Sequence, residues 1–94
     1  MKLNLPPKPP TGTWEDVLST DYGRINKKWE EEILLAAATF SHAHVDPSLR
    51  SSAVEGNLVV LRNGSEVVTV CAIAEDGEMT SLAPERWPEK YRRS

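Results

Sequence analysis

Two histidines and an aspartate near the middle of the chain are of the residue types that bind metal ions. His42, His44 and Asp46 alternate with other residues, and imidazole nitrogens and carboxylate oxygens are both zinc ligands in proteins. A further histidine would be needed beside them, but proline, at position 47, follows Asp46, and the chain has no other histidine. We therefore predict neither a metal site nor a cofactor, and expect these side chains to lie on a loop.

The other reactive side chains form no catalytic set. Cys71 is the only cysteine and lies in an apolar run without a basic neighbour, which is typical of a small buried side chain rather than a reactive thiolate. Glu30, Glu31 and Glu32 are consecutive, so on a helix they point in different directions and form no carboxylate pair. There is no glycine-rich phosphate loop. The sequence therefore predicts that the protein is not an enzyme.

Aromatic and basic residues are interleaved near the end of the chain. Residues 84–94 contain Trp87, Tyr91, Arg92 and Arg93, and arginines beside aromatic rings are suited to holding another molecule. The alternative is that Trp87 packs onto the core and the remaining residues form a basic tail.

The clearest element that could position these side chains is a β-meander over residues 57–82. Asn63-Gly64 and Asp76-Gly77 are typical two-residue hairpin turns, and both separate runs rich in β-branched residues. Turns of that length determine the strand register. The predicted register places Val60 opposite Val67, and Cys71 opposite Leu82.

Both faces of this predicted sheet are apolar. One face carries Leu58, Val60, Val67, Cys71, Ile73 and Leu82. The other carries Val59, Leu61, Val68, Val70, Ala72, Ala74 and Met79. An antiparallel sheet with one face in water alternates apolar with polar residues, so here both faces need cover. Either the two ends of the chain and a short helix provide it, or a second chain completes the uncovered face or an open sheet edge.

The segment before the meander is predicted to be helical. Thr13 can cap a short helix that runs to about residue 19. A longer amphipathic helix is expected over residues 22–41, because apolar side chains recur there every three or four positions. The second half of this helix, which includes Leu35, is apolar on nearly every side, so we expect it to be buried or to contact another chain.

A third, short helix is predicted over residues 47–55. Asp46-Pro47 is a typical helix start and Gly56 a typical end. Helices followed by a hairpin are the order of a winged-helix DNA-binding domain, and a DNA-binding transcriptional regulator is the alternative function. The predicted recognition helix contains one arginine and one glutamate, however, and the chain has a net charge of −3. Because phosphate contacts dominate affinity for DNA, this composition disfavours nucleic acid as a partner.

These elements predict an α+β fold in three parts. Residues 1–12 form a proline-rich extended leader. Residues 13–83 form one domain, in which N-terminal helices, one of them long and amphipathic, pack on a C-terminal three-stranded antiparallel β-meander. Residues 84–94 form the basic and aromatic C-terminal tail. The chain has no apolar run long enough to span a membrane and a single cysteine, so we expect a cytoplasmic protein.

The apolar surfaces predict a protein-binding function. We expect a small non-enzymatic module, such as an accessory, adaptor or inhibitor subunit of the kind that phage or prokaryotic genes encode. Its partner is another protein, a second copy of itself in a homo-oligomer, or both, and neither a membrane nor a small-molecule substrate is expected. The predicted binding residues are Leu35, Val68, Val70, Trp87, Tyr91, Arg92 and Arg93.

Overall fold

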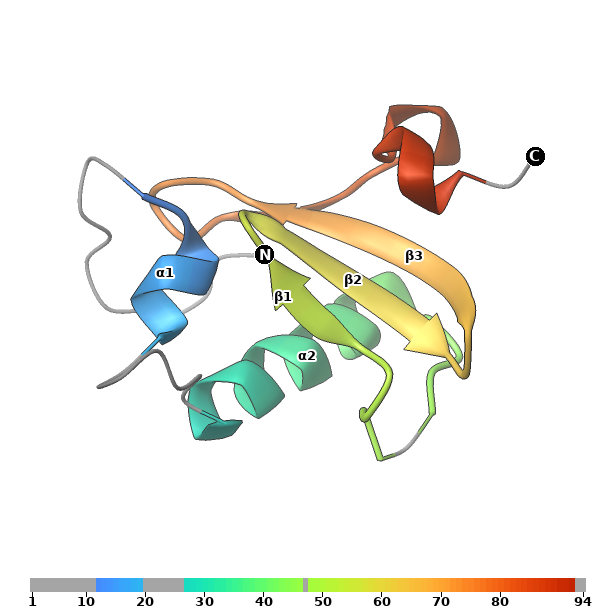
Figure 1. Cartoon of the computed structure of the whole chain (residues 1–94), viewed down its shortest axis with the longest axis horizontal. Helices are drawn as coiled ribbons and strands as arrows, with labels where there is room; N and C mark the ends of the chain where they lie inside the picture. Colours follow the sequence, from blue (N-terminus) through green and yellow to red (C-terminus); the bar gives the residue numbers. More distant parts are fainter. Residues whose placement is uncertain (1–11, 20–26, 47, 93–94) are drawn as a thin grey trace.

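Within its described residues, the chain folds as two α-helices on a four-stranded antiparallel sheet (Figure 1). The computed structural model of the protein describes residues 12–19, 27–46 and 48–92. Its elements, in chain order, are α1 (Trp14–Leu18), α2 (Lys27–Ser41), β1 (Ala53–Glu55), β2 (Leu58–Asn63), β3 (Glu66–Ile73), β4 (Met79–Ser81) and the 3₁₀ turns η2 (Pro84–Arg86) and η3 (Glu89–Tyr91). The predicted α+β class is therefore confirmed. The predicted leader, except for Gly12, lies outside the described residues.

α1 begins where the sequence predicts, because Thr13 and Asp16 form a capping box. The Thr13 hydroxyl accepts a hydrogen bond from the Asp16 N–H, and the Asp16 carboxylate accepts one from the Thr13 N–H at 2.7 Å. Trp14 then attaches the helix to the sheet: its backbone N–H donates to the side chain of Asn57, and its indole N–H donates to the Ala74 carbonyl, both at 2.9 Å. This short helix thus connects two separate turns of the sheet.

α2 lies along one face of the sheet (Figure 1). Ile33, Leu34 and Ala37 are buried against the strands, whereas Leu35 is 58% exposed. Of the two alternatives for this half of the helix, burial within the fold is therefore wrong for Leu35, and contact with another chain stays a prediction. Residues 20–26, where the predicted helix begins, lie outside the described residues. No helix in the described part of the chain is long and apolar enough to cross a membrane.

The third predicted helix is wrong. Residues 48–52 form turns, and residues 53–55 form β1, which pairs with β2 and makes the sheet four-stranded rather than three-stranded. Glu55 pairs with Leu58, so Gly56 opens a two-residue hairpin loop with a φ of +63°. Glycine at the first loop position is typical of such hairpins. The prediction of a helix end at the same glycine is therefore wrong, since glycine is typical of both positions.

The register between β2 and β3 also differs from the predicted one. Asn63 pairs with Glu66, so the turn consists of Gly64 and Ser65, and Val60 lies opposite Val70 rather than Val67. Gly64 has a φ of +65°, and it occupies the first loop position, as Gly56 does. A β-bulge at Leu61/Arg62 then leaves Val68 without a partner residue on β2.

The register between β3 and β4 differs by one residue from the predicted register. Met79 lies opposite Ile73, and Cys71 lies opposite Ser81 instead of the predicted Leu82. The reason is a three-residue loop, residues 75–77, which ends in Gly77 at a φ of +90°. Three-residue hairpin loops place a left-handed residue, usually glycine, at this position.

The observed register gives the sheet two apolar faces with different cover. The side chains on the helix face, which pack against α1 and α2, are Val54, Val59, Leu61, Cys71, Ile73 and Met79. On the other face, Val60 and Val70 are buried beneath Trp87 and Tyr91. Residues 84–92 therefore form a C-terminal cap, which Figure 1 shows in red on the side of the sheet opposite α2. Of the two explanations that the sequence allowed for the second face, the structure supports cover by the protein's own tail.

Candidate functional site

The C-terminal cap, residues 84–92, is held together by hydrogen bonds from its own side chains. The Trp87 indole N–H donates to the Leu82 carbonyl at 2.9 Å and fixes the ring on the sheet. Arg92 donates through Nε to the Trp87 carbonyl at 2.9 Å and through Nη2 to the Glu85 carbonyl at 2.8 Å. Two guanidinium donors thus tie the two 3₁₀ turns together, which makes this region a folded unit rather than a loose tail.

The first half of β3 lies at an open edge of the sheet beside this cap. β4 pairs only with residues 71–73 of β3. After the Leu82 N–H donates to the Val70 carbonyl at 2.9 Å, the chain leaves the strand and enters the cap. In the part of the chain that the structure describes, residues 67–69 thus have β2 on one side and no strand on the other.

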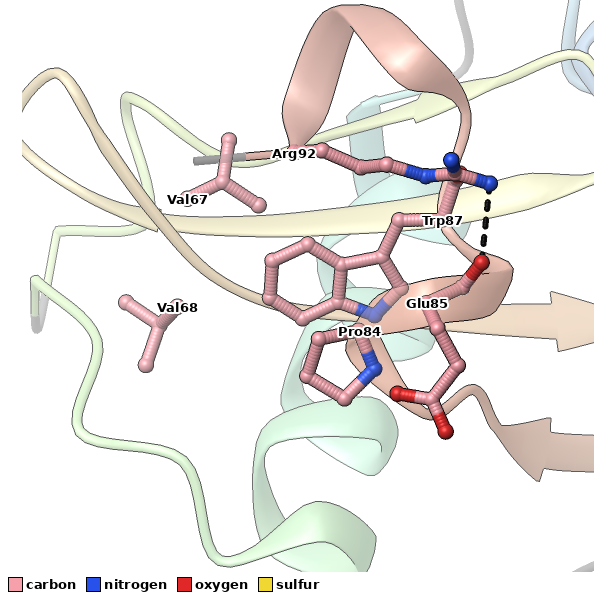
Figure 2. A pocket seen from close by; sticks show the side chains of 6 residues that line it. All are labelled: Val67, Val68, Pro84, Glu85, Trp87 and Arg92. Carbon is pink, nitrogen blue, oxygen red and sulfur yellow. Dashed lines mark hydrogen bonds between the residues drawn. The ribbon is translucent and has the colours of Figure 1, made fainter. Parts of the chain in front are cut away.

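A hollow of about 420 Å³ lies where this open edge meets the cap. Its lining residues are Val67, Val68, Pro84, Glu85, Trp87 and Arg92, and we refer to it as the Val68 hollow. Figure 2 shows the six-membered ring of Trp87 facing Val67 and Val68 across the hollow, with Pro84 beside the indole. At the rim, the Arg92 guanidinium donates a hydrogen bond to the Glu85 carbonyl. An apolar wall with a polar rim is suited to an apolar group that is attached to a longer molecule.

A second hollow, of about 540 Å³, borders the first at Val67. Its lining residues are Arg50, Ser51, Arg62, Gly64, Ser65, Val67, Lys90 and Tyr91, and we refer to it as the basic hollow. The Tyr91 ring lies between two cations, with the Arg62 guanidinium carbon 5.5 Å and the Lys90 ammonium nitrogen 4.9 Å from its centre. Both distances are in the range of cation–π interactions.

Ionisable groups at the basic hollow influence one another. Glu55 lies 3.6 Å from an Arg62 nitrogen and 3.8 Å from the Lys90 ammonium nitrogen. Burial, followed by a hydrogen bond with Glu55, raises the pKa of the Tyr91 hydroxyl. A hydrogen bond with Tyr91 is the main cause that raises the pKa of Lys90. The phenol is thus held in its neutral form and the amine in its charged form.

The structure brings together some of the predicted binding residues and separates others. Val68, Trp87 and Arg92 line the Val68 hollow, and Tyr91 lines the neighbouring one. Val70 is fully buried beneath the cap, so it belongs to the core and not to a contact surface.

The remaining predicted residues lie elsewhere. Leu35 is on α2, which covers the opposite face of the sheet. Arg93 lies outside the described residues.

Arg50, Arg62 and Lys90 line the basic hollow but were not among the predicted binding residues. In the sequence, Arg50 falls within the third predicted helix, Arg62 directly precedes the Asn63-Gly64 turn, and Lys90 falls within the predicted basic tail. No sequence spacing connects residues 50, 62 and 90, and the Gly56 hairpin was the only available indication that residues 50–55 lie beside β2.

The other sequence candidates gain no support from the geometry. His42 and His44 are exposed, and the described residues contain no group of three side chains placed to hold a metal ion. Cys71 is buried in the sheet, and burial raises the pKa of its thiol. The proposed recognition helix of a winged-helix domain is replaced by turns and β1.

Comparison with known proteins identifies no relative: the chain matches no protein-family model, no curated protein and no solved structure. The geometry of the two hollows and of the open edge is therefore the basis for inferring a function.

Proposed function

We propose that the protein is a small protein-binding module that receives an extended segment of a partner along the open edge of β3. An apolar side chain of that segment occupies the Val68 hollow. The observation that carries this proposal is the position of the hollow directly beside strand residues 67–69, which have no strand on their outer side in the described structure.

A peptide that adds as a strand to an open sheet edge is recognised in two ways, through its backbone and through its side chains. Backbone hydrogen bonds along an open edge give affinity without regard to sequence, and a hollow for every second side chain gives selectivity. An open edge is otherwise a risk for aggregation, and proteins protect it with proline, with lysine or with a β-bulge. Residues 67–69 are Val-Val-Thr and contain neither proline nor lysine. The bulge at Val68 is the one such device within these three residues, and the backbone groups of the edge on either side of it serve for binding in this proposal.

We also propose a biological role for this module. By occupying the surface of its partner, the module acts as an accessory, adaptor or inhibitor subunit. Its single cysteine is buried and unpaired, which fits a reducing compartment, so we propose that it works in the cytoplasm.

Site-specific photo-crosslinking in the cells that make the protein tests this proposal. The photoreactive residue p-benzoylphenylalanine is placed at Val68, at Glu85 on the opposite wall of the hollow, or at Thr80, which is exposed on β4 and does not line the hollow. We expect positions 68 and 85 to yield the same adduct and position 80 to yield none. The proposal would be contradicted if all three positions gave the same adduct in equal yield, or if positions 68 and 85 gave none.

A further inference from the structure

We propose that the basic hollow binds an oxyanion carried by the partner segment, either the carboxylate of an acidic side chain or a phosphoryl group. This inference deepens the proposed function and rests on it for the identity of the ligand, because it states the chemistry of the segment that lies along β3. Three lines of observation carry it.

The first observation is the charge of the lining. The chain as a whole has a net charge of −3, yet Arg50, Arg62 and Lys90 line one hollow, and no acidic side chain from the described residues lines it. Cations gathered on an acidic chain repel one another unless an anion lies between them. The hollow is therefore electrostatically complementary to a negatively charged group.

The second observation is that Glu55, the carboxylate that pairs with Arg62 and Lys90, neutralises these two cations only in part. Glu55 approaches Arg62 and Lys90 at 3.6 and 3.8 Å, which is too long for charge-assisted hydrogen bonds. The Arg62 guanidinium also donates to the Ser51 carbonyl, but at 3.5 Å. The Lys90 side chain is 68% exposed. Donors of both side chains therefore remain available to an incoming oxyanion.

The third observation is a buried, uncharged donor on a residue that lines the hollow. The Ser51 hydroxyl is buried and has no hydrogen-bond partner in the described structure, although a buried polar atom normally has one. Ser51 lines the hollow together with Gly64 and Ser65 of the β2–β3 turn. A rotation of this side chain about its Cα–Cβ bond would turn the hydroxyl toward the hollow, where an oxyanion would accept its hydrogen bond.

The two hollows share Val67, so one extended segment can reach both. Side chains on the same face of a strand are two residues apart. We therefore expect the partner segment to carry an apolar residue for the Val68 hollow and an acidic or phosphorylated residue about two or four positions away.

Titration of the full ¹⁵N-labelled chain with defined probes tests the inference. The probes are a tetraglutamate peptide, inorganic phosphate and, as the control of opposite charge, a tetralysine peptide, each at low ionic strength. We expect tetraglutamate or phosphate to shift the amide signals of Ser51, Gly64 and Ser65 in a saturable manner. Added salt should weaken binding, because exposed charges are screened, and tetralysine should not shift these signals.

Variants connect the shifts to the hollow. Removing one exposed cation, with Arg50→Gln or Lys90→Gln, is expected to weaken probe binding about two- to five-fold. Arg86→Gln is the matched control, because Arg86 is an exposed arginine of η2 that does not line the hollow. The Arg86→Gln variant should bind the probes with the same affinity as the wild type.

Each outcome of the titration has one meaning. Shifts with tetraglutamate support a carboxylate ligand, and shifts with phosphate alone support a phosphoryl ligand. Absence of shifts with both probes, shifts scattered over the surface, or equal losses in Arg50→Gln and Arg86→Gln would overturn the inference. Arg50 and Lys90 do not line the Val68 hollow, so such a failure would leave the crosslinking result at Val68 unaffected. If positions 68 and 85 gave no crosslink but the probes still shifted the signals of Ser51, Gly64 and Ser65, the proposed function would be contradicted and the oxyanion site would stand without a known ligand.

Discussion

Trp87 has two roles at once. Its ring, together with that of Tyr91, covers Val60 and Val70 on the second face of the sheet, and it also forms a wall of the Val68 hollow. The hydrogen bond from its indole to the Leu82 carbonyl determines where that wall stands. A change at this single residue therefore affects the stability of the fold and the shape of the proposed binding site together.

Replacing Trp87 with alanine is expected to lower the free energy of unfolding by about 3–5 kcal/mol, because it removes a buried aromatic side chain and leaves a cavity over Val60 and Val70. Urea denaturation measures the change. Arg86→Ala, an exposed neighbour in the cap, is the control and should change stability by less than about 0.5 kcal/mol. A loss for Trp87→Ala as small as that of the control would mean that the cap does not cover this face.

The Cys71 thiol is expected to react slowly with a disulfide reagent at neutral pH. It is fully buried in the sheet, and burial raises its pKa, which disfavours the reactive thiolate. The rate of reaction with Ellman's reagent should rise steeply when denaturant unfolds the protein. Rapid modification of the folded protein would contradict the buried position.

Among the elements, the first two helices and the presence of the turns could be predicted from the sequence, whereas the third predicted helix and the strand register were wrong. Local signals are sufficient for the Thr13 capping box and for the presence of turns at Gly64 and Gly77. Register, however, depends on which loop position each glycine occupies. Moving Gly64 from the second to the first position, together with the bulge at Val68, changes the partner of Val60 from Val67 to Val70.

Only the part of the candidate site that lies within one short segment could be predicted from the sequence. The aromatic and arginine pattern of residues 84–94 is local and identified Trp87, Tyr91 and Arg92. The basic hollow combines residues from three distant segments, and only the correct topology places them together. In particular, residues 53–55 had to be recognised as a strand beside β2 before Arg50 and Arg62 could be connected.

The hairpin glycines provide a test at the scale of an element. A methyl group at Gly56 or Gly64 would meet no atom within 4 Å, but both residues have a positive φ, at +63° and +65°. Alanine at either position is therefore expected to cost about 1–2 kcal/mol through backbone conformation alone. Thermal or urea unfolding measures the loss, with Ser65→Ala as the control. An unchanged stability in both glycine variants would contradict the observed turns.

At the scale of the whole molecule, stability is expected to fall at alkaline pH. Burial raises the pKa of Tyr91 in the folded protein, above the ordinary value of about 10 for an unfolded tyrosine. The unfolded chain therefore loses this proton first, and stability declines as the pH rises through the folded pKa. Lys90, whose pKa is also raised, contributes in the same direction.

Urea unfolding at a series of pH values checks this expectation. The contribution of Tyr91 should be constant below a pH of about 9 and should be lost above about 10. The variant Tyr91→Phe has no phenol to ionise, so its stability should decline less over the same range. An equal decline in the variant and the wild type would show that Tyr91 is not responsible.

Self-association is a second property of the whole molecule that mutation can test. Leu35 is the only large apolar side chain that is strongly exposed in the described structure. If the chain forms a homo-oligomer through α2, Leu35→Glu should reduce the solution mass measured by light scattering and leave the unfolding free energy within about 0.5 kcal/mol of the wild type. Val70→Glu should instead unfold the protein, because Val70 is fully buried. An unchanged mass in Leu35→Glu would exclude this surface.

The order of the cap in the chain has a consequence for biosynthesis. Residues 84–92 leave the ribosome after the strands that they cover, since synthesis proceeds from the N-terminal side at about 5–20 residues per second. During that interval Val60 and Val70 have no cover from Trp87 and Tyr91. A sheet that forms before the cap docks has one apolar face without cover, so prompt docking of the cap limits aggregation of the new chain.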